Sequence, residues 1–264
     1  MSHRLLTCAL GAVLCASTIA EAAQCTAASG ERRVPLLELY TSEGCDSCPP
    51  ADRWLSGLAG RGFGGDRVVA LAFHVDYWNY IGWVDPFAQQ RYSERQRQAA
   101  ARNQSKFVYT PQFMVNGRDY RRGSWRDDFG EKVAALNRDK PRADLRLALN
   151  MTQDALTVSG GAMVADANQR AQAQTWLALY ENNLASDVTA GENRGKRLAH
   201  DFVVRDIVGP LGVDAQGKAA IDHRFKLDPR WKARDLGVAA FVQNARSGDV
   251  LQSLALACPQ PDTR

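Results

Sequence analysis

The sequence has little of several features that define large protein classes. Its four histidines are spread over 264 residues, and its arginines are scattered along the chain instead of gathered in one block. A formal charge of +4 from such scattered residues gives nucleic-acid binding little support, so no nucleic-acid partner is expected. Beyond residue 23, no stretch is apolar enough to cross a membrane. Internal repeats and low-complexity linkers are also lacking.

Cysteines are few as well, and their spacing argues against zinc. The chain has six cysteines, of which Cys45 and Cys48 form a CxxC motif. A structural zinc site needs four ligands, and this motif has neither a second CxxC nor closely spaced histidines to complete one. We therefore expect no zinc and no other cofactor.

The N-terminus has the three parts of a secretory signal peptide. A short basic start precedes an apolar run from Leu5 to Ala20, and small residues follow at Ala20 and Ala22. Residues 1–23 are therefore predicted to be a signal peptide, and the mature protein to be periplasmic or secreted. No membrane insertion is expected after signal cleavage.

Cleavage of this segment would leave four cysteines in an oxidising compartment, where disulfides persist. Four cysteines allow three pairings. If Cys45 pairs with Cys48, then Cys25 is left with Cys258, and their bond would tie the mature N-terminus to the end of the chain. Such a bond would stabilise the fold by on the order of 4–5 kcal/mol in the chain-entropy model. Two free, buried thiols are the alternative.

The first part of the mature chain has an alternating strand and helix pattern. Two apolar runs, Val34–Tyr40 and Arg67–Val75, suit strands that are covered on both faces, and helical periodicity lies between them. Asp85 is placed as the N-cap of a second helix, and Asn116-Gly117 signals a two-residue hairpin. The predicted order is β-α-β-α-β-β-α, a mixed sheet ending near Arg138.

The pattern of apolar and polar residues changes from Pro141 onward. Short, partly alternating apolar runs are separated by Gly, Asn and Asp clusters, which is typical of an antiparallel β-sandwich. The fold class predicted is therefore an α/β domain at residues 24–140 followed by an all-β sandwich domain at residues 141–258. Residues 259–264 are predicted to be a tail.

The stretch TSEGCDSCPP, from Thr41 to Pro50, is predicted to lie where the first strand ends and the first helix begins. A helix N-terminus favours an anion, here the thiolate of Cys45. Cys45 is expected to be an exposed nucleophile and Cys48 a half-buried resolving thiol. A purely structural disulfide is the alternative.

Several stretches resemble known proteins. The CxxC at the first helix and Thr110-Pro111 before an Asn-Gly hairpin resemble the thioredoxin superfamily, in which a proline at this place is cis and contacts substrate. The resemblance narrows to a family of secreted, thioredoxin-like bacterial proteins known only as a domain of unknown function, number twelve twenty-three. The blocks that carry it are ELYTSEGCDSCPPADRWLSGL, LAFHVDYWNYIGWVDPFA, YSERQR and VYTPQFMVNGR.

This resemblance implies a thioredoxin-like fold and places Cys45, Cys48, Thr110 and Pro111 at redox positions. The leading hypothesis is an exported thiol–disulfide oxidoreductase, a redox enzyme whose partners are protein thiols or disulfides and an unknown redox partner. The resemblance brings no established substrate. Glu38 is a further candidate, because such oxidoreductases often carry a buried acid on this strand that exchanges a proton with the resolving thiol. An ion pair between Glu38 and an arginine such as Arg33 or Arg67 is the alternative.

Two other functions remain open from the sequence. A copper(I) metallochaperone would use Cys45 and Cys48, with His74 as a third ligand. The alternative for His74 is a histidine hydrogen-bonded to backbone at a strand end. A non-catalytic interaction module on the same scaffold is the third hypothesis. The aromatic run Asp76–Trp83 either walls the cysteine pair or packs onto the sheet, and His200-Asp201 is interpreted as structural.

Overall fold

A computed structural model describes residues 24–121 and 128–258. The predicted signal peptide (residues 1–23) and the predicted tail (residues 259–264) lie outside the described residues. Within the described ranges, no helix is both long and apolar enough to span a membrane.

Two fully buried parallel strands form the centre of the main sheet. β2 (Leu36–Thr41) and β3 (Val69–His74) pair from Leu36↔Val69 to Thr41↔His74, and every residue of both strands is buried. Helix α1 (Pro49–Ser56) connects them. Their nearly continuous apolar character follows from this position, because both faces of the sheet are covered.

An antiparallel hairpin extends the sheet beyond β2. β4 (Gln112–Val115) pairs with β2 and turns into β5 (Arg118–Tyr120) through Asn116 and Gly117. Both turn residues have positive φ, 53° and 77°, which explains the Asn-Gly sequence. The predicted two-residue hairpin is confirmed.

Helices cover the two faces of this sheet. α2 (Gln90–Arg102) packs on one face with Tyr40 and Phe73. α1 and α3 (Phe129–Arg138) pack on the other face with Leu39. Alternate residues of β2 therefore point to opposite layers of the molecule.

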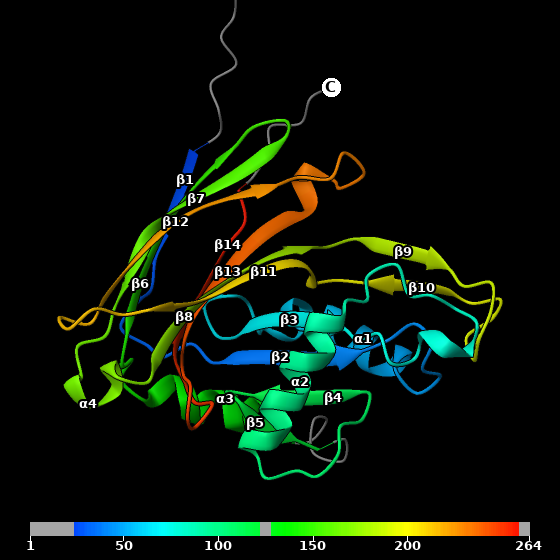
Figure 1. Cartoon of the computed structure of the whole chain (residues 1–264), viewed down its shortest axis with the longest axis horizontal. Helices are drawn as coiled ribbons and strands as arrows, with labels where there is room; N and C mark the ends of the chain where they lie inside the picture. Colours follow the sequence, from blue (N-terminus) through cyan, green and yellow to red (C-terminus); the bar gives the residue numbers. More distant parts are fainter. Residues whose placement is uncertain (1–23, 122–127, 259–264) are drawn as a thin grey trace, which may run out of the picture.

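Four strands from later in the chain continue the same sheet on the other side of β3. They are β8 (Ala173–Glu181), β11 (Val203–Gly212), β13 (Leu236–Asn244) and β14 (Val250–Leu256). The resulting eight-stranded mixed sheet has the order β14-β13-β8-β11-β3-β2-β4-β5. Figure 1 shows it crossing the molecule, with α2 in front of β2 and β3.

The predicted fold class, a thioredoxin-like α/β domain followed by a separate all-β antiparallel sandwich, is wrong. Val203 of β11 pairs in parallel with Ala72 of β3, and the Ala72 amide donates to the Phe202 carbonyl at 2.8 Å. Strands from both sides of residue 140 thus belong to one sheet. The division of the chain near residue 140 itself stays a prediction, with α3 ending at Arg138 and the next strand beginning at Asp144.

The burial of individual strands explains this error. β13 is buried at all but its last residue, because both of its faces are covered. By contrast, β12 (Lys218–Lys226) largely alternates between buried and exposed residues, as a sandwich strand with one solvated face does. The two strand types follow one another along the chain, and short apolar runs do not reveal which sheet each one joins.

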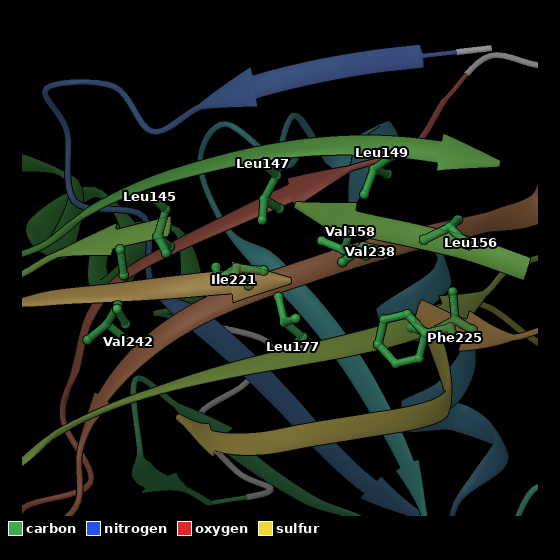
Figure 2. Close-up of a cluster of buried hydrophobic side chains, with 14 of the residues drawn as sticks. Leu145, Leu147, Leu149, Leu156, Val158, Leu177, Ile221, Phe225, Val238 and Val242 are labelled. Atoms are coloured by element: carbon green, nitrogen blue, oxygen red, sulfur yellow. The ribbon is translucent and has the colours of Figure 1, made fainter. Parts of the chain in front are cut away.

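A second, four-stranded antiparallel sheet packs over the far half of the first. Its order is β1-β6-β7-β12, with β1 (Gln24–Ala28), β6 (Asp144–Met151) and β7 (Ala155–Met163) joining β12. Figure 2 shows the apolar core between the sheets, where Leu147 and Ile221 of the small sheet lie near Leu177 and Val238 of the large one.

A separate two-stranded hairpin extends toward the opposite end of the molecule, beside α1 (Figure 1). β9 (Leu184–Asp187) and β10 (Arg197–His200) pair with each other in a sheet of their own. Short helices complete the described chain, namely α4 (Ala167–Arg170), η1 (Ala59–Arg61), η2 (Asn79–Ile81) and η3 (Ala233–Asp235).

Candidate functional site

Cys45 and Cys48 form a disulfide in the loop between β2 and α1, with their Cα atoms 5.5 Å apart. The loop is tight, because the Cys48 amide donates to the Cys45 carbonyl at 3.2 Å. Cys48 is the N-cap of α1, and Pro49 and Pro50 are its first two residues. Proline fits there because the first amides of a helix have no intrahelical acceptor. The cysteine pair therefore lies at a helix N-terminus, where the helix dipole favours a thiolate.

The expected exposure of the pair is wrong. Cys45 is 1% exposed and Cys48 is 0% exposed, so neither side chain meets solvent. Sequence patterns near the motif do not show this, because part of its surroundings, including Asn193, comes from the distant β9–β10 hairpin.

The loop 188–196 at the tip of this hairpin lies over the cysteine pair. The side-chain amide of Asn193 donates to the carbonyls of Glu43 at 2.7 Å and Cys45 at 2.9 Å. Beside it, the Asp46 amide donates to the Glu192 carboxylate at 3.0 Å. Asn193 itself is fully buried, so these bonds close the loop onto the motif.

The aromatic run forms a second wall of the site. Trp78 lies against Gly44, where an added Cβ would come within 3.0 Å of the Trp78 Cβ. The Trp78 indole donates to the Thr110 hydroxyl at 2.7 Å, and the Thr110–Pro111 bond is cis. Trp78 thus connects the Thr110-Pro111 segment to the loop that carries Cys45.

Glu38 lies on the other side of the sheet from α1. Its carboxylate accepts from Arg95 of α2 at 2.8 Å and from the Tyr40 hydroxyl at 3.2 Å. Leu37 and Leu39, its neighbours along β2, pack instead in the cluster that contains α1. The structure therefore favours the ion-pair interpretation of Glu38, with Arg95 in place of Arg33 or Arg67.

Behind the disulfide lies an acid–histidine cluster composed of Glu43, Asp52, His74, Asp85 and His200, all of them buried. His74 Nδ1 lies 2.7 Å from Asp85 Oδ2. Burial alone would lower the pKa of His74, but the facing carboxylates of Asp85, Asp52 and Glu43 outweigh it and raise that pKa above its usual value. Burial likewise acts to raise the pKa of Asp85, and His74 reverses the direction, so that pKa is lowered.

The second half of the cluster joins the hairpin to α1. His200 of β10 places Nε2 3.0 Å from the Glu43 carboxylate and Nδ1 3.9 Å from Asp52 in the first turn of α1. Burial raises the pKa of Asp52 above its usual value, although His200 and His74 act in the opposite direction. The rings of His74 and His200 lie 4.9 Å apart, edge to face. Three carboxylates and two histidines thus share one buried site beside the disulfide.

Metal binding gains no support from this arrangement. No group of three or more His, Cys, Asp or Glu residues in the described part of the chain is arranged to hold a metal ion. For the copper(I) alternative, Cys45 and Cys48 are bonded to each other; Asp85 contacts His74 Nδ1, and His74 Nε2 is buried without a hydrogen-bond partner.

Cys25 and Cys258 form the other disulfide, with Cα atoms 5.9 Å apart and 233 positions between them in sequence. Cys25 lies in β1 of the small sheet, and Cys258 follows β14 at the edge of the large sheet. This bond fastens the two sheets together at the ends of the described chain and takes no part in the candidate site.

A family model described as "Protein of unknown function (DUF1223)" matches residues 36–243, a range that spans β2 through β13 and includes every residue of the candidate site. The chain belongs to the DUF1223 family. The predicted family membership is thereby confirmed. No curated protein matches the chain.

Two solved structures are similar to this DUF1223 chain. A crystal structure of a protein from Agrobacterium tumefaciens shares 26% identity, with a TM-score of 0.60 over 89% of this chain and 98% of the other. HBP35 of Porphyromonas gingivalis has a TM-score of 0.68 at 18% identity, covering 89% of this chain and 79% of the other. The HBP35 likeness concerns the fold alone.

Sequence patterns single out only part of this DUF1223 site. Asp85 reads as a helix N-cap, yet α2 begins at Gln90 and Asp85 instead binds His74. Asp52 resembles an ordinary acidic residue of a first helical turn, and Asn193 an ordinary loop residue. Of the residues in the acid–histidine cluster, sequence patterns single out only His74, Asp85 and His200, and the partners of His200 lie more than 140 positions away.

Proposed function

We propose that this chain is an exported thiol–disulfide oxidoreductase that exchanges electrons with protein thiols or disulfides through Cys45 and Cys48. The observation that carries the proposal is the disulfide between cysteines two residues apart at the N-terminus of α1. A helix N-terminus stabilises the thiolate that forms when such a bond opens. A disulfide that served only to brace the fold would gain nothing from this placement.

In the oxidising direction the substrate is a dithiol. A substrate thiolate attacks the Cys45 sulfur, the Cys45–Cys48 bond breaks, and Cys48 leaves as a thiolate. The second substrate thiol, once deprotonated, attacks the mixed disulfide and releases Cys45. Two electrons pass to the cysteine pair, and the two protons lost by the substrate thiols balance those that convert Cys45 and Cys48 to thiols. A separate redox partner then reoxidises the pair, and the same steps in reverse reduce a substrate disulfide.

Export to the periplasm or beyond the cell is part of the proposal. Two disulfides in one chain suit an oxidising compartment, and the N-terminal sequence is that expected of a signal peptide. The partners are then proteins that carry thiols or disulfides in the same compartment.

Insulin reduction tests the proposal. Wild-type protein that has been reduced in advance and freed of dithiothreitol is expected to reduce insulin in a single turnover and to precipitate its B chain, and Cys45→Ser is expected to abolish this reaction. Cys48→Ser should stop at a mixed disulfide between Cys45 and insulin, visible by non-reducing electrophoresis and mass spectrometry. Reduced wild-type protein that leaves insulin unreduced, with no trapped adduct in Cys48→Ser, would contradict the proposal.

A further inference from the structure

The tip of the β9–β10 hairpin is hydrogen-bonded to the loop that carries the Cys45–Cys48 disulfide. We propose that residues 188–196 form a lid that must swing away from Cys45 before any thiol can react with this bond. Such a lid controls access to the sulfurs whatever reaction they perform, so it goes beyond the oxidoreductase activity proposed above.

The closed lid is latched by Asn193. One buried side-chain amide donates to two main-chain carbonyls, those of Glu43 and Cys45. Gly191 packs closely beside it, where an added Cβ would lie 3.2 Å from Ile81 and 3.4 Å from Trp83. With the Asn193 hydrogen bonds and the apolar contacts of Gly191 in place, Cys45 is 1% exposed. An attacking sulfur therefore has no path to the disulfide while the lid is closed.

A second attachment holds the base of the lid. His200 of β10 contacts the carboxylate of Glu43, the same residue whose carbonyl binds Asn193. The hairpin is therefore fixed to the cysteine loop at two points on Glu43, one through backbone and one through side chain. Opening exchanges these contacts for water, which solvates the buried carboxylate and imidazole and so offsets part of the cost.

Each connection of the hairpin to the main sheet contains a residue with a left-handed backbone conformation. Asn183 and Phe202, at the two roots, have φ of 54° and 58°, a left-handed conformation that a phenylalanine seldom adopts. Hydrogen bonds to side chains hold these roots. The backbone amide of Asn183 donates to the Asp201 carboxylate, and the backbone amide of Phe202 donates to the side-chain oxygen of Asn182. Since β9 and β10 pair only with each other among the described strands, the hairpin can move without breaking a ladder of either large sheet.

The rate at which the Cys45–Cys48 disulfide is reduced measures how far the lid restricts access to it. Full-length oxidised protein is mixed with dithiothreitol, quenched by alkylation, and mapped by peptide mass, which follows Cys45–Cys48 separately from Cys25–Cys258. Asn193→Ala removes the donor of both latch bonds, so reduction should be about tenfold faster than in the wild type. Arg194→Ala alters an exposed neighbour in the same loop and should stay within about twofold of the wild-type rate.

Two further measurements keep the proposal open to refutation. Asn193→Asp keeps the size of the side chain but cannot donate, so it should also accelerate reduction. The wild-type bond should react at least about tenfold more slowly than the same bond in an oxidised peptide spanning Gly44–Pro50. A peptide rate matched by the wild type, or folded Asn193 variants that react within twofold of it, would overturn the lid. Because dithiothreitol is the attacking thiol, a failure of insulin reduction would not affect this result.

Discussion

His74 and Asp85 form a buried ion pair whose strength depends on pH. The raised pKa of His74 means that its contribution to stability is fully present below its usual value of 6.5 and is lost as pH rises through the higher folded value. The lowered pKa of Asp85 gives the opposite pH dependence. The contribution of Asp85 to stability is present above its usual pKa of 3.8 and is lost as pH falls through the lower pKa of the folded state. The two windows leave the pair strongest in mildly acidic solution.

A substitution at His74 should therefore change how stability varies with pH. We expect the free energy of unfolding of the wild type to fall as pH rises above 6.5, and His74→Gln to be less stable with a smaller fall. Urea unfolding between pH 6 and 9 with both disulfides intact measures this. His223→Gln, on β12 outside the cluster, is the control and should keep the wild-type slope. An identical slope in His74→Gln would show that His74 does not titrate in this range.

At the residue level, the sequence predicts where Cys45 and Cys48 lie along the chain, but it does not predict which residues surround them. The strand end, the helix start and the two prolines are local features, so Cys45 and Cys48 are placed correctly in the loop that leads into α1. Their burial depends on Asn193, which is 148 positions from Cys45. An asparagine side chain that caps a distant loop carries no periodic or compositional signal, and neither does the contact between His200 and Glu43.

Among elements, the contact of β2 with α2 depends on one buried charge pair. Glu38 of β2 meets Arg95 of α2, whose guanidinium also lies over the rings of Phe73, Trp176 and Phe241 at 5.1–5.5 Å from their centroids. Burial acts to lower the pKa of Arg95, and Glu38 outweighs it and raises that pKa. Arg95 thus remains charged between two layers of the protein and depends on Glu38 for its counter-charge.

Removing that counter-charge should destabilise the protein without touching the disulfide. Glu38→Gln leaves a buried guanidinium unpaired, so we expect a loss of about 3–5 kcal/mol in the free energy of unfolding. Replacing both Glu38 and Arg95 with leucine should recover part of this loss. Reduction of Cys45–Cys48 by dithiothreitol should keep the wild-type rate in Glu38→Gln, because Glu38 faces α2 and the cysteines adjoin α1. A slower rate would revive Glu38 as a proton donor to Cys48.

The sequence predicts the positions of individual strands and turns more reliably than it predicts which strands pair with one another. The strand runs and the Asn116-Gly117 turn depend on local periodicity and backbone preference, and the structure has them near their expected positions. The start of α2 is different, because the helix begins at Gln90 and not at Asp85. Asp85 accepts from the Phe87 amide through Oδ1 and meets His74 through Oδ2, so its carboxylate joins a local turn to a tertiary contact.

For the whole molecule, the continuous sheet predicts cooperative unfolding. β3 bonds to β11, so the strands before residue 140 and those after it share one core surface. We expect a single urea transition that is the same by tryptophan fluorescence and by circular dichroism. Two separated transitions would instead support independent domains divided near residue 140. The sequence could not decide this, because the two parts are joined by the parallel pairing between Val203 and Ala72 and by the ladder between β1 and β6, and neither pairing leaves a mark on the paired runs.

The burial of Cys45 and Cys48 also has a consequence for cellular redox chemistry. If the proposed lid holds, small thiols reach this disulfide slowly, and it does not equilibrate with the ambient thiol pool on the time scale of protein encounters. Under the proposed oxidoreductase function, its oxidation state would then record the history of contacts with particular proteins and not the bulk potential of the compartment. Two populations of the same chain, one oxidised and one reduced, would persist side by side as a kinetic memory of those encounters.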